Sequence, residues 1–364
     1  MEKYISLQDF EDAATNVLAK PAMEYFRNGA TEQQTLAENR LAFRRLRILP
    51  KCLMGITGAD LRTTILGHEV SMPVGIAPSA MQKTAHHDGE VAIAKAAQAE
   101  GTIYTLSTAS TCSIEEVASA APDAIKWFQV YVFRDREVTR KLVMRAEKAG
   151  FKALLLTVDT PVFGIIRSDI RNSYAFAEHL KLANFVEYFS KSDNADDDMK
   201  DYVGKLFEKT LTWEDVKWLK SITKLPVIAK GILRAEDAVK AAEMGCSGIL
   251  VSNHGARQLD GLPATIEVLP EVVDALKNYN VEVYMDGGVT TGNDVYKALA
   301  LGAKMVLVGR PALWGLAVGG QAGVQRTLNI LRTELESTVQ IAGTPTVADI
   351  TRDMVRHESS FRKL

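Results

Sequence analysis

Residues 249–258 read ILVSNHGARQ and combine an apolar start with a polar end. The first three are aliphatic, which is typical of a strand that is buried on both faces in a parallel sheet. The chain then turns polar and carries His254 and, three residues later, Arg257. In α/β barrels, the loops at the carboxyl ends of the strands hold the chemistry. This stretch therefore predicts a strand that delivers two reactive side chains to such a loop.

His254 and Arg257 suit two different tasks. An imidazole takes up and releases a proton near neutral pH, so His254 is a candidate general base. A guanidinium offers a planar set of donors that matches a carboxylate, so Arg257 is a candidate for binding an acidic substrate. Taken alone, the pair is also compatible with a structural loop histidine and a surface charge. The rest of the chain decides between these alternatives.

Similar apolar runs recur from residue 74 onward. Stretches rich in Ala, Glu and Lys separate them, for example residues 89–100 and 235–244, and predict intervening helices. Strands that alternate with helices form right-handed crossovers and a parallel sheet. Eight such units favour a closed (β/α)8 TIM barrel, an α/β fold, over an open doubly wound sheet. The eight predicted strands are 74–76, 103–106, 125–130, 153–158, 227–229, 249–251, 281–285 and 305–308.

We expect the whole chain, residues 1–364, to form a single domain. Residues 1–70 predict an N-terminal helical cap, and residues 71–342 predict the barrel with its closing helices. The interval 160–210 after the fourth strand is much longer than the others and contains KSDNADDD at residues 191–198. Such a polar run without periodicity predicts a mobile, lid-like loop over the barrel mouth; the alternative is a tolerated surface insertion.

The composition excludes several classes of protein. The 43 basic and 45 acidic residues give a formal net charge of −2, which provides no electrostatic footprint for nucleic acid or an anionic membrane. Three scattered cysteines form no disulfide framework, and the chain begins with no signal peptide, so we expect a protein that is not secreted. No apolar run is long enough to span a membrane. The C-terminal Arg362-Lys363-Leu364 is similar to a peroxisomal address, so the expected location is the peroxisome or the cytoplasm.

Glycine-containing turns follow the last two predicted strands. Asp286, Gly287 and Gly288 end the seventh strand, and Gly309 and Arg310 end the eighth. Barrels commonly hold a phosphate at this point with glycine backbone N–H groups, and an arginine adds a charge-assisted fork. A turn needs glycine anyway, so neither turn is specific alone. The two turns together predict a phosphate site.

Polar or small residues stand at the ends of the other strands. A lone Ser or Thr at such a position is usually a helix cap or a turn residue. Six strand ends that present polar groups to one mouth are more than folding requires, so they predict a ligand site. The residues concerned are Pro78, Ser79, Ala80, Ser107, Gln129, Thr157, Lys230 and Ser252.

Three motifs connect these observations to a known family, namely SNHGARQ at residues 252–258, AKG at 229–231 and TVDTP at 157–161. With the motifs in family order from Tyr25 onward, the chain resembles the FMN-dependent L-2-hydroxy-acid oxidases, the glycolate oxidase and lactate oxidase family, and is most similar in pattern to the animal type. The resemblance implies that FMN is the cofactor and that the strand-end residues and phosphate turns hold it. It also implies that Lys230 stabilises the anionic reduced flavin electrostatically.

The resemblance assigns roles around the substrate as well. His254 would remove a proton while a hydride equivalent passes to the flavin, and Asp159 would orient the imidazole and stabilise its charged form. Whether the carbon-bound hydrogen leaves as hydride or as a proton stays open. The substrate carboxylate would bind Arg257 and Tyr25, and Tyr131 would donate a hydrogen bond near the reacting oxygen.

The implied reaction oxidises an L-2-hydroxy acid to a 2-oxo acid and passes the electrons to oxygen, which yields hydrogen peroxide. Ala80 stands where oxidases of the family carry alanine and several dehydrogenase relatives carry glycine, which favours oxygen as the acceptor. The alternatives are a dehydrogenase that uses a quinone or another carrier, a flavin-binding barrel with little turnover, and a sugar-phosphate barrel without flavin. The family suggests a homotetramer or homo-octamer.

Three positions depart from the family pattern. Ile166 stands where the family has a second active-site arginine, and its neighbour Arg167 restores the charge if the loop shifts by one residue. Thr290 replaces an arginine after the Asp-Gly-Gly-Val motif, so one cationic contact with FMN is missing. Ala109 stands where glycolate-preferring relatives carry tryptophan. A smaller side chain there leaves a larger pocket and predicts substrates longer or bulkier than glycolate.

His86, His87 and Asp88 are residue types found in metal sites. Adjacent side chains are expected to point in different directions, and the stretch opens a helix. We therefore expect no metal site here.

Overall fold

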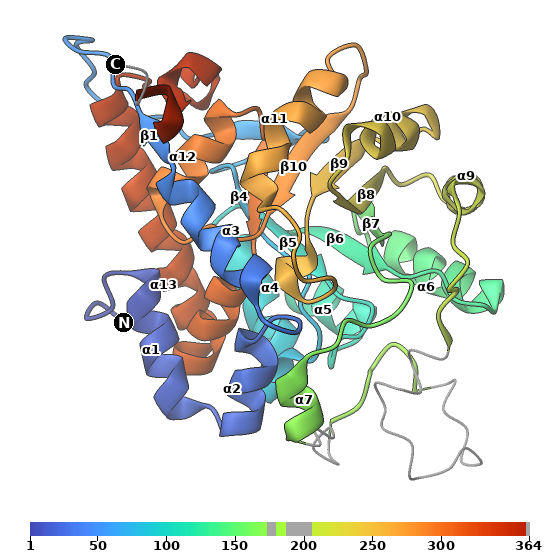
Figure 1. Ribbon diagram of the computed structural model, residues 1–364. Coiled ribbons are helices and arrows are strands. Elements are labelled where there is room, and N and C mark those ends of the chain that lie inside the picture. Colours follow the sequence, from blue (N-terminus) through green and yellow to red (C-terminus); the bar gives the residue numbers. More distant parts are fainter. Residues whose placement is uncertain (173–179, 187–205, 362–364) are drawn as a thin grey trace.

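The computed structural model describes residues 1–172, 180–186 and 206–361. Eight parallel strands form a closed barrel in the order β10-β11-β4-β5-β6-β7-β8-β9, with helices around it (Figure 1). The predicted (β/α)8 TIM barrel is confirmed. The barrel strands are β4 (Val74–Ile76), β5 (Ile103–Leu106), β6 (Ile125–Val130), β7 (Ala153–Thr157), β8 (Val227–Ile232), β9 (Gly248–Val251), β10 (Glu282–Asp286) and β11 (Met305–Val308).

Side chains fill the inside of the barrel as a core of its own. Seven of the eight barrel strands contribute large, completely or almost completely buried residues to it. The opposite faces of the same strands pack against the helices in a second, larger core. Because both faces are buried, the strands read as continuous apolar runs in the sequence. The large residues that the barrel strands give to the inner core are Ile103, Trp127, Leu155, Ile228, Leu250, Tyr284, Met305 and Leu307.

A short antiparallel hairpin of β2 (Thr63–Ile65) and β3 (His68–Val70) closes the amino-terminal end of the barrel. The side chains of Ile65 and Val70 join the inner core. The backbone N–H of Leu66 donates to the carboxylate of the first residue of β10 at 3.2 Å. With this end plugged, only the end at which the strands finish is left for a ligand.

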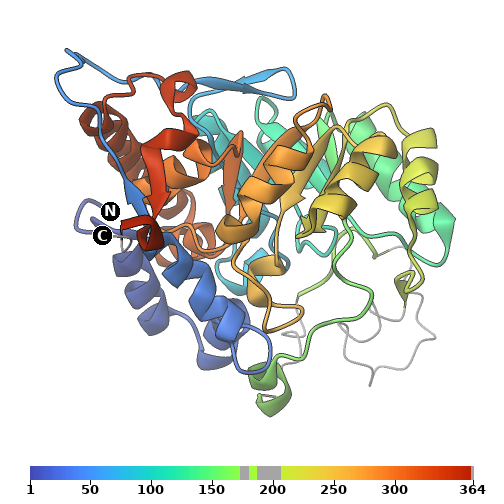
Figure 2. The same cartoon turned by 45° about the horizontal axis from the view of Figure 1, so that its top comes forward.

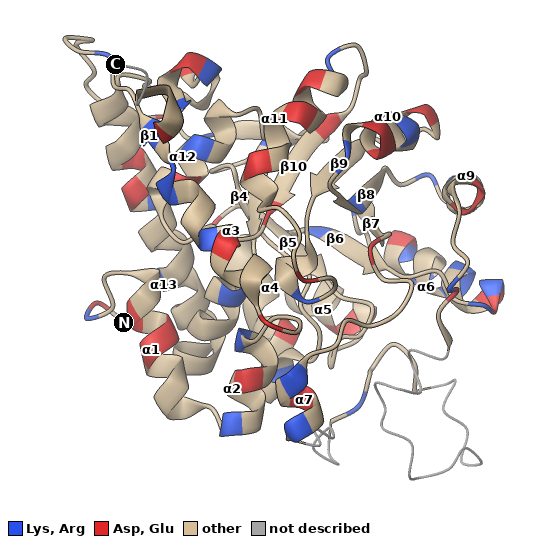
Figure 3. Cartoon of the chain, in the orientation of Figure 1, with Lys and Arg blue, Asp and Glu red and all other residues tan. Residues whose placement is uncertain are grey.

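Helices cover the outside of the barrel, and several of them begin at residues whose side chains cap the first turn. The side chains of Ser113 and Thr291 each accept a hydrogen bond from a backbone N–H in the first helical turn. The acidic side chain three positions later accepts the backbone N–H of the same Ser or Thr. Figure 3 shows that charged residues lie mainly on these outer helices. The α-helices are α4 (Gly89–Ala99), α5 (Ile114–Ala120), α6 (Arg136–Lys148), α7 (Arg167–Arg171), α9 (Trp213–Ser221), α10 (Ala235–Glu243), α11 (Thr265–Ala275), α12 (Gly292–Ala300) and α13 (Arg310–Ala342). The 3-10 helices are η1 (Gln82–Thr84), η2 (His254–Ala256), η3 (Val347–Asp349), η4 (Arg352–Met354) and η5 (Glu358–Phe361).

Three N-terminal helices form a cap, which comprises α1 (Leu7–Val17), α2 (Lys20–Arg27) and α3 (Gln34–Arg44). Figures 1 and 2 show them together on one side of the barrel, with α1 beside α13. α1 buries Phe10 and Ala14 completely. The apolar face of the cap thus fixes its helices to the barrel, and their polar faces remain available to a site.

Residues 46–70, expected to belong to the helical cap, contain strands instead. In addition to the β2–β3 hairpin, β1 (Leu46–Ile48) pairs antiparallel with β12 (Val355–His357) near the other end of the chain. Strands of three residues are too short to show a periodic pattern, and the partner of β1 is remote in the sequence. The helical prediction therefore holds only as far as the end of α3.

The lid-like loop predicted within residues 160–210 falls largely outside the described residues, and so does the acidic run at 191–198. Helix α7 is the first described element after β7. Where the described chain resumes, an isolated bridge pairs Phe207 with Phe133 beyond β6. Among the helices in the described part of the chain, none is long and apolar enough to cross a membrane.

Candidate active site

A cavity of about 840 Å³ lies where the barrel strands end, between the strand ends and the cap helices. Both phosphate turns, most of the predicted strand-end residues and most of the predicted substrate contacts line it. The sequence-predicted residues on its wall are Tyr25, Pro78, Ser79, Ala80, Ser107, Gln129, Tyr131, Thr157, Lys230, His254, Arg257, Asp286, Gly287, Gly288, Gly309 and Arg310. Residues from far-apart segments therefore meet at one cavity, as expected for a ligand site.

His254 and Asp159 form a hydrogen-bonded pair at the cavity. His254 follows β9, adopts φ of +59°, and places Nδ1 2.8 Å from Oδ1 of Asp159, which follows β7. Burial raises the pKa of Asp159, but the charges of His254 and Lys230 outweigh that effect and lower it to about 2. The carboxylate is thus ionised at neutral pH and orients the imidazole.

Lys230 brings a buried cation to the same place. Its side chain lies on the cavity wall near the end of β8, the residue is only 4% exposed, and Nζ has no hydrogen-bond partner among the described residues. A buried ammonium without a hydrogen-bond partner is unfavourable, so this atom needs an acceptor or anion from a ligand. The electron-rich edge of a flavin fits this requirement.

Gly231 leaves room for the side chain of Asp159 next to β8. It adopts φ of +109° at an irregularity in the β8–β9 pairing. A Cβ atom at this position would lie 2.6 Å from Cβ and Cγ of Asp159. Only glycine leaves the carboxylate in place between Lys230 and His254. Sequence reasoning treated Gly231 only as part of a motif, and its steric role became visible in the structure.

The side chain of Gln129 is held in a fixed orientation. Its Nε2 donates to Oγ1 of Thr157 at 3.0 Å, and its Oε1 accepts from the backbone N–H of Thr108 at 3.1 Å and from Ser107 Oγ at 3.4 Å. These residues present a preorganised row of donors and acceptors along one wall of the cavity. Such a row suits the polar edge of a flavin ring.

The two glycine turns form the other end of the cavity, here called the phosphate end. Gly287 and Gly288 adopt φ of +94° and +83°, and a Cβ on Gly288 would lie 2.0 Å from the backbone oxygen of Asn39 in α3. Glycine therefore lets this turn pack directly against the cap. Gly309 precedes α13 and completes the wall. Small residues on both turns leave the backbone accessible to an anion.

Ser252 differs from its predicted place. It is completely buried and does not line the cavity; its Oγ accepts from the N–H of His254 at 3.1 Å. Burial raises the pKa of Asp286, and a side-chain hydrogen bond from Ser252 opposes that shift. Ser252 thus supports two wall residues from behind, because the strand ends one residue before the chain turns into the cavity.

Arg257 and Arg310 tie α2 to the catalytic loop. The guanidinium of Arg257 lies 4.9 Å from the ring centre of Tyr25 and donates through Nη1 to the carbonyls of Tyr25 and Asn28. Arg310 donates to the carbonyls of Phe26, Gly255 and Asn28. The cap therefore helps to position both predicted anion-binding arginines.

The predicted substrate side of the cavity is largely apolar. Tyr131 stacks on Phe207 with ring centres 4.4 Å apart, and burial raises the pKa of its phenol, which therefore stays protonated as a donor. Phe163, Ile166 and Leu182 also line the cavity, as does Ala109. Phe207 and Leu182 lie in a region that sequence reasoning assigned to a loop, so no pattern pointed to them.

Arg167 does not replace the arginine missing at Ile166. Ile166 is 5% exposed and faces the cavity, whereas Arg167 begins α7, pairs with Glu32 and lines a separate small pocket. The one-residue loop shift is therefore not seen in the structure, and a contact between Arg167 and the substrate stays a prediction. The helix start fixes the register, because consecutive residues at an N-terminus point to different sides.

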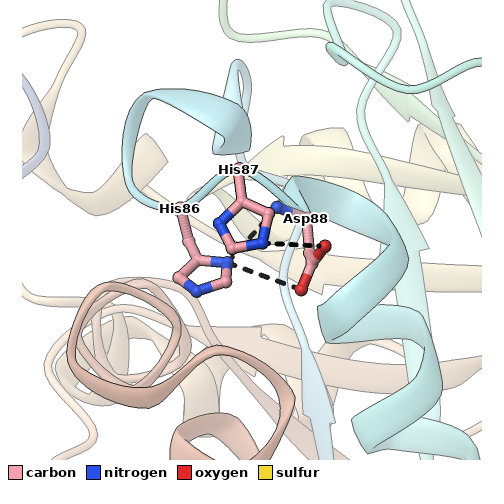
Figure 4. Close-up of side chains that lie close together, drawn as sticks. All are labelled: His86, His87 and Asp88. Atoms are coloured by element: carbon pink, nitrogen blue, oxygen red, sulfur yellow. Dashed lines mark hydrogen bonds and ion pairs between the residues drawn. The ribbon is translucent and has the colours of Figure 1, made fainter.

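His86, His87 and Asp88 lie closer together than expected. Figure 4 shows both imidazoles beside the carboxylate, and the two ring centres are 4.1 Å apart. The argument that adjacent side chains diverge is therefore wrong here. However, Nδ1 of His86 accepts the backbone N–H of Asp88 at 3.2 Å, and none of the three lines the large cavity. The absence of a metal site stays a prediction.

Comparisons with known proteins agree with this site. Residues 14–357 match the family model described as FMN-dependent dehydrogenase. The chain is 48% identical to 2-hydroxyacid oxidase 1 of Homo sapiens, with 98% of this chain and 97% of that protein covered, and 49% identical to glycolate oxidase 3 of Oryza sativa subsp. indica, with 99% and 98% covered. A solved structure of mandelate oxidase superposes with a TM-score of 0.89 at 39% identity and covers 97% of this chain and 98% of that one.

The chemical groups that line the cavity fit FMN. It offers a buried ammonium at Lys230 that has no hydrogen-bond partner among the described residues, a fixed polar row at Gln129, and glycine turns at the phosphate end. Together with the comparisons, this shows that the chain belongs to the FMN-dependent dehydrogenase family and is an FMN-dependent oxidoreductase of 2-hydroxy acids.

Proposed function

We propose that this enzyme oxidises L-2-hydroxy acids with side chains larger than that of glycolate and passes the electrons to oxygen. In the complete reaction the substrate loses two electrons and two protons to become a 2-oxo acid, and oxygen gains both to become hydrogen peroxide. FMN, when bound, supplies the two-electron acceptor that connects the two halves.

The residues around the cavity support this reaction in separate roles. His254 accepts a proton from the substrate, and Asp159, 2.8 Å away, orients the ring and stabilises the imidazolium that results. Arg257 binds the substrate carboxylate, aided by Tyr25, whose ring packs against it. Tyr131 remains protonated and donates to the reacting oxygen. Lys230 stabilises negative charge that develops on the cofactor side.

The observation that carries the substrate preference is the apolar wall around Ala109 and Ile166. Ala109 leaves room where glycolate-preferring relatives have an indole, and Ile166 replaces a charge with a branched hydrocarbon. Phe163, Leu182 and Phe207 extend the same surface. Burial of each methylene against such a wall stabilises binding by about 0.8 kcal/mol. Glycolate has no side chain that could use this surface.

The test is steady-state kinetics of the FMN-loaded enzyme with glycolate, L-lactate, longer straight-chain L-2-hydroxy acids and (S)-mandelate. The specificity constant, kcat/KM, should rise with apolar side-chain size until the pocket is full. Glycolate as the best substrate would overturn the preference. If the enzyme under air forms hydrogen peroxide and 2-oxo acid in equal amounts, this supports oxygen as the electron acceptor. Turnover only with a quinone or another carrier would refute it.

We further propose that the chain works as one catalytic unit within a homotetramer or homo-octamer, as the family resemblance suggests. Light scattering of the purified enzyme tests the assembly.

The tripeptide at residues 362–364 supports a peroxisomal location, with the cytoplasm as the alternative. Imaging of the tagged chain with and without the tripeptide tests the location, and an unchanged distribution would refute the peroxisomal address.

A further inference from the structure

At the phosphate end, this chain lacks one cation that the family pattern supplies. Thr290 stands at that position, and its N–H and hydroxyl both donate to Oδ2 of Asp294, at 3.0 and 3.1 Å. The same oxygen accepts the N–H of Thr291, and Glu334 accepts that of Gly292 at 2.7 Å. The donors around Thr290 are therefore already used by carboxylates, and these carboxylates add negative charge near the phosphate end.

Arg310 does not make up for this deficit alone. Its guanidinium already donates to three backbone carbonyls, which hold α2 against the catalytic loop. Burial lowers its pKa to about 9, and the positive charges of Arg257 and Arg40 add to that effect. An anion between these cations would relieve their mutual repulsion.

The cap helices bring a different arginine to the phosphate end. The turn at Gly288 packs so closely on α3 that a Cβ there would collide with the backbone of Asn39. The next residue, Arg40, lines the cavity. Figure 3 shows basic residues on α3, the helix beside these turns. The contact between the glycine turn and α3 thus fixes the backbone next to Arg40 beside the phosphate end.

Arg40 belongs to a cluster with spare positive charge. Its Nη2 lies 2.7 Å from Oε2 of Glu11 in α1, while Nε of Arg27 in α2 lies 3.4 Å from Oε1 of the same carboxylate. Two cations share one largely buried anion, and all three residues line the cavity. The cluster therefore carries a net charge of +1, and because the Arg40 side chain is 42% exposed, its guanidinium is accessible to a phosphate group.

We propose that Arg40, presented by the cap helix α3 and paired with Glu11, supplies the cationic contact with the FMN phosphate that Thr290 lacks. The cap is then part of the cofactor site. Binding of FMN, but not of riboflavin, depends on Arg40, because riboflavin has no phosphate.

The test is titration of the apoprotein with FMN and with riboflavin, followed by quenching of flavin fluorescence. Arg40→Met keeps the apolar stem and removes the charge. It should weaken FMN binding about ten- to hundredfold, the effect of one charge-assisted contact, and leave riboflavin binding unchanged. Thr290→Arg in the Arg40→Met background should restore most of the FMN affinity.

Three further variants separate charge from packing. Arg47→Met removes a cation from the same region, where Arg47 pairs with Glu358 away from the cavity, and should leave FMN binding unchanged. Arg44→Met removes the other cavity-lining arginine of α3 and should have a smaller effect than Arg40→Met. Glu11→Gln breaks the ion pairs of the cluster but frees Arg40, so FMN binding should stay the same or tighten.

Several outcomes would overturn the proposal. They are an equal loss of FMN affinity in Arg40→Met and Arg47→Met, an equal loss of riboflavin affinity in Arg40→Met, or a larger loss in Arg44→Met. Weakened FMN binding by Glu11→Gln would instead assign the effect to cap packing. None of these binding measurements depends on which hydroxy acid the enzyme prefers, so they stand apart from the kinetic test of substrate preference.

Discussion

The Nδ1 atom of His254 lies 2.8 Å from Oδ1 of Asp159, although the two residues are 95 positions apart in the chain. Asp159 follows β7 and His254 follows β9, and β8 pairs with both strands. At the end of β8, Gly231 leaves the space that the carboxylate occupies. The barrel therefore assembles a proton acceptor and its orienting carboxylate from loops that are neighbours only in three dimensions.

Asp159→Asn should lower kcat strongly while FMN binding persists. An amide keeps the size of the side chain but removes the charge that stabilises the imidazolium, and comparable changes in other His-carboxylate pairs cost up to about 10⁴-fold. Rapid-reaction kinetics of flavin reduction would measure the step directly. A variant that reduces its flavin at the wild-type rate would remove Asp159 from the proposed role.

The same carboxylate predicts a specific acid sensitivity. The pKa of Asp159 is lowered from 3.8 to about 2 in the folded protein, so its ionised form stabilises the fold above pH 3.8. That stabilisation should be lost as the pH falls from 3.8 through about 2. Urea unfolding at several pH values should show a steeper acid loss of unfolding free energy for wild type than for Asp159→Asn. Parallel curves would contradict this expectation.

Ala109→Trp should reverse the substrate preference. An indole at this position fills the space beside the apolar wall, so kcat/KM for bulky hydroxy acids should fall about tenfold or more, while that for glycolate holds or rises. Ala109→Ser is the matched control and should behave like wild type. If both variants keep the wild-type order of substrates, Ala109 does not limit the pocket.

Ile166→Arg and Arg167→Met test which of the two neighbours faces the substrate. Restoring a guanidinium at 166 should favour small polar substrates over apolar ones, because it places a charge against the apolar wall. Arg167→Met should leave kcat/KM within about twofold of wild type, because its partner is an exposed glutamate outside the cavity. A large loss in Arg167→Met together with no effect of Ile166→Arg would show that the loop adopts the other register.

Much of the barrel and its mouth could be predicted from the sequence, since each barrel strand is a short apolar run buried on both faces. The strands β1 and β12 were missed because a three-residue strand has no period of its own and its partner lies at the other end of the chain. The same holds for the β2–β3 hairpin, whose role as a plug depends on the barrel around it.

The sequence placed residues on the cavity wall where a motif fixes both residue type and strand end, as for His254, Lys230 and the glycine turns. Two predicted residues do not line the cavity, because a motif does not fix the direction in which a side chain points. Ser252 points behind the wall, and Arg167 points away from it. Sequence also gave no signal for the proposed role of Arg40, because that role depends on how α3 packs against a glycine turn some 250 residues later.

The most direct test of the central claim is anaerobic titration of the FMN-loaded enzyme with a chain-length series of L-2-hydroxy acids, read by visible flavin absorbance. The cavity and its apolar wall predict that these substrates bleach the flavin, and that reduction becomes more efficient from glycolate to longer and bulkier acids. A flavin that no hydroxy acid reduces, or one that glycolate reduces most efficiently, would contradict the account.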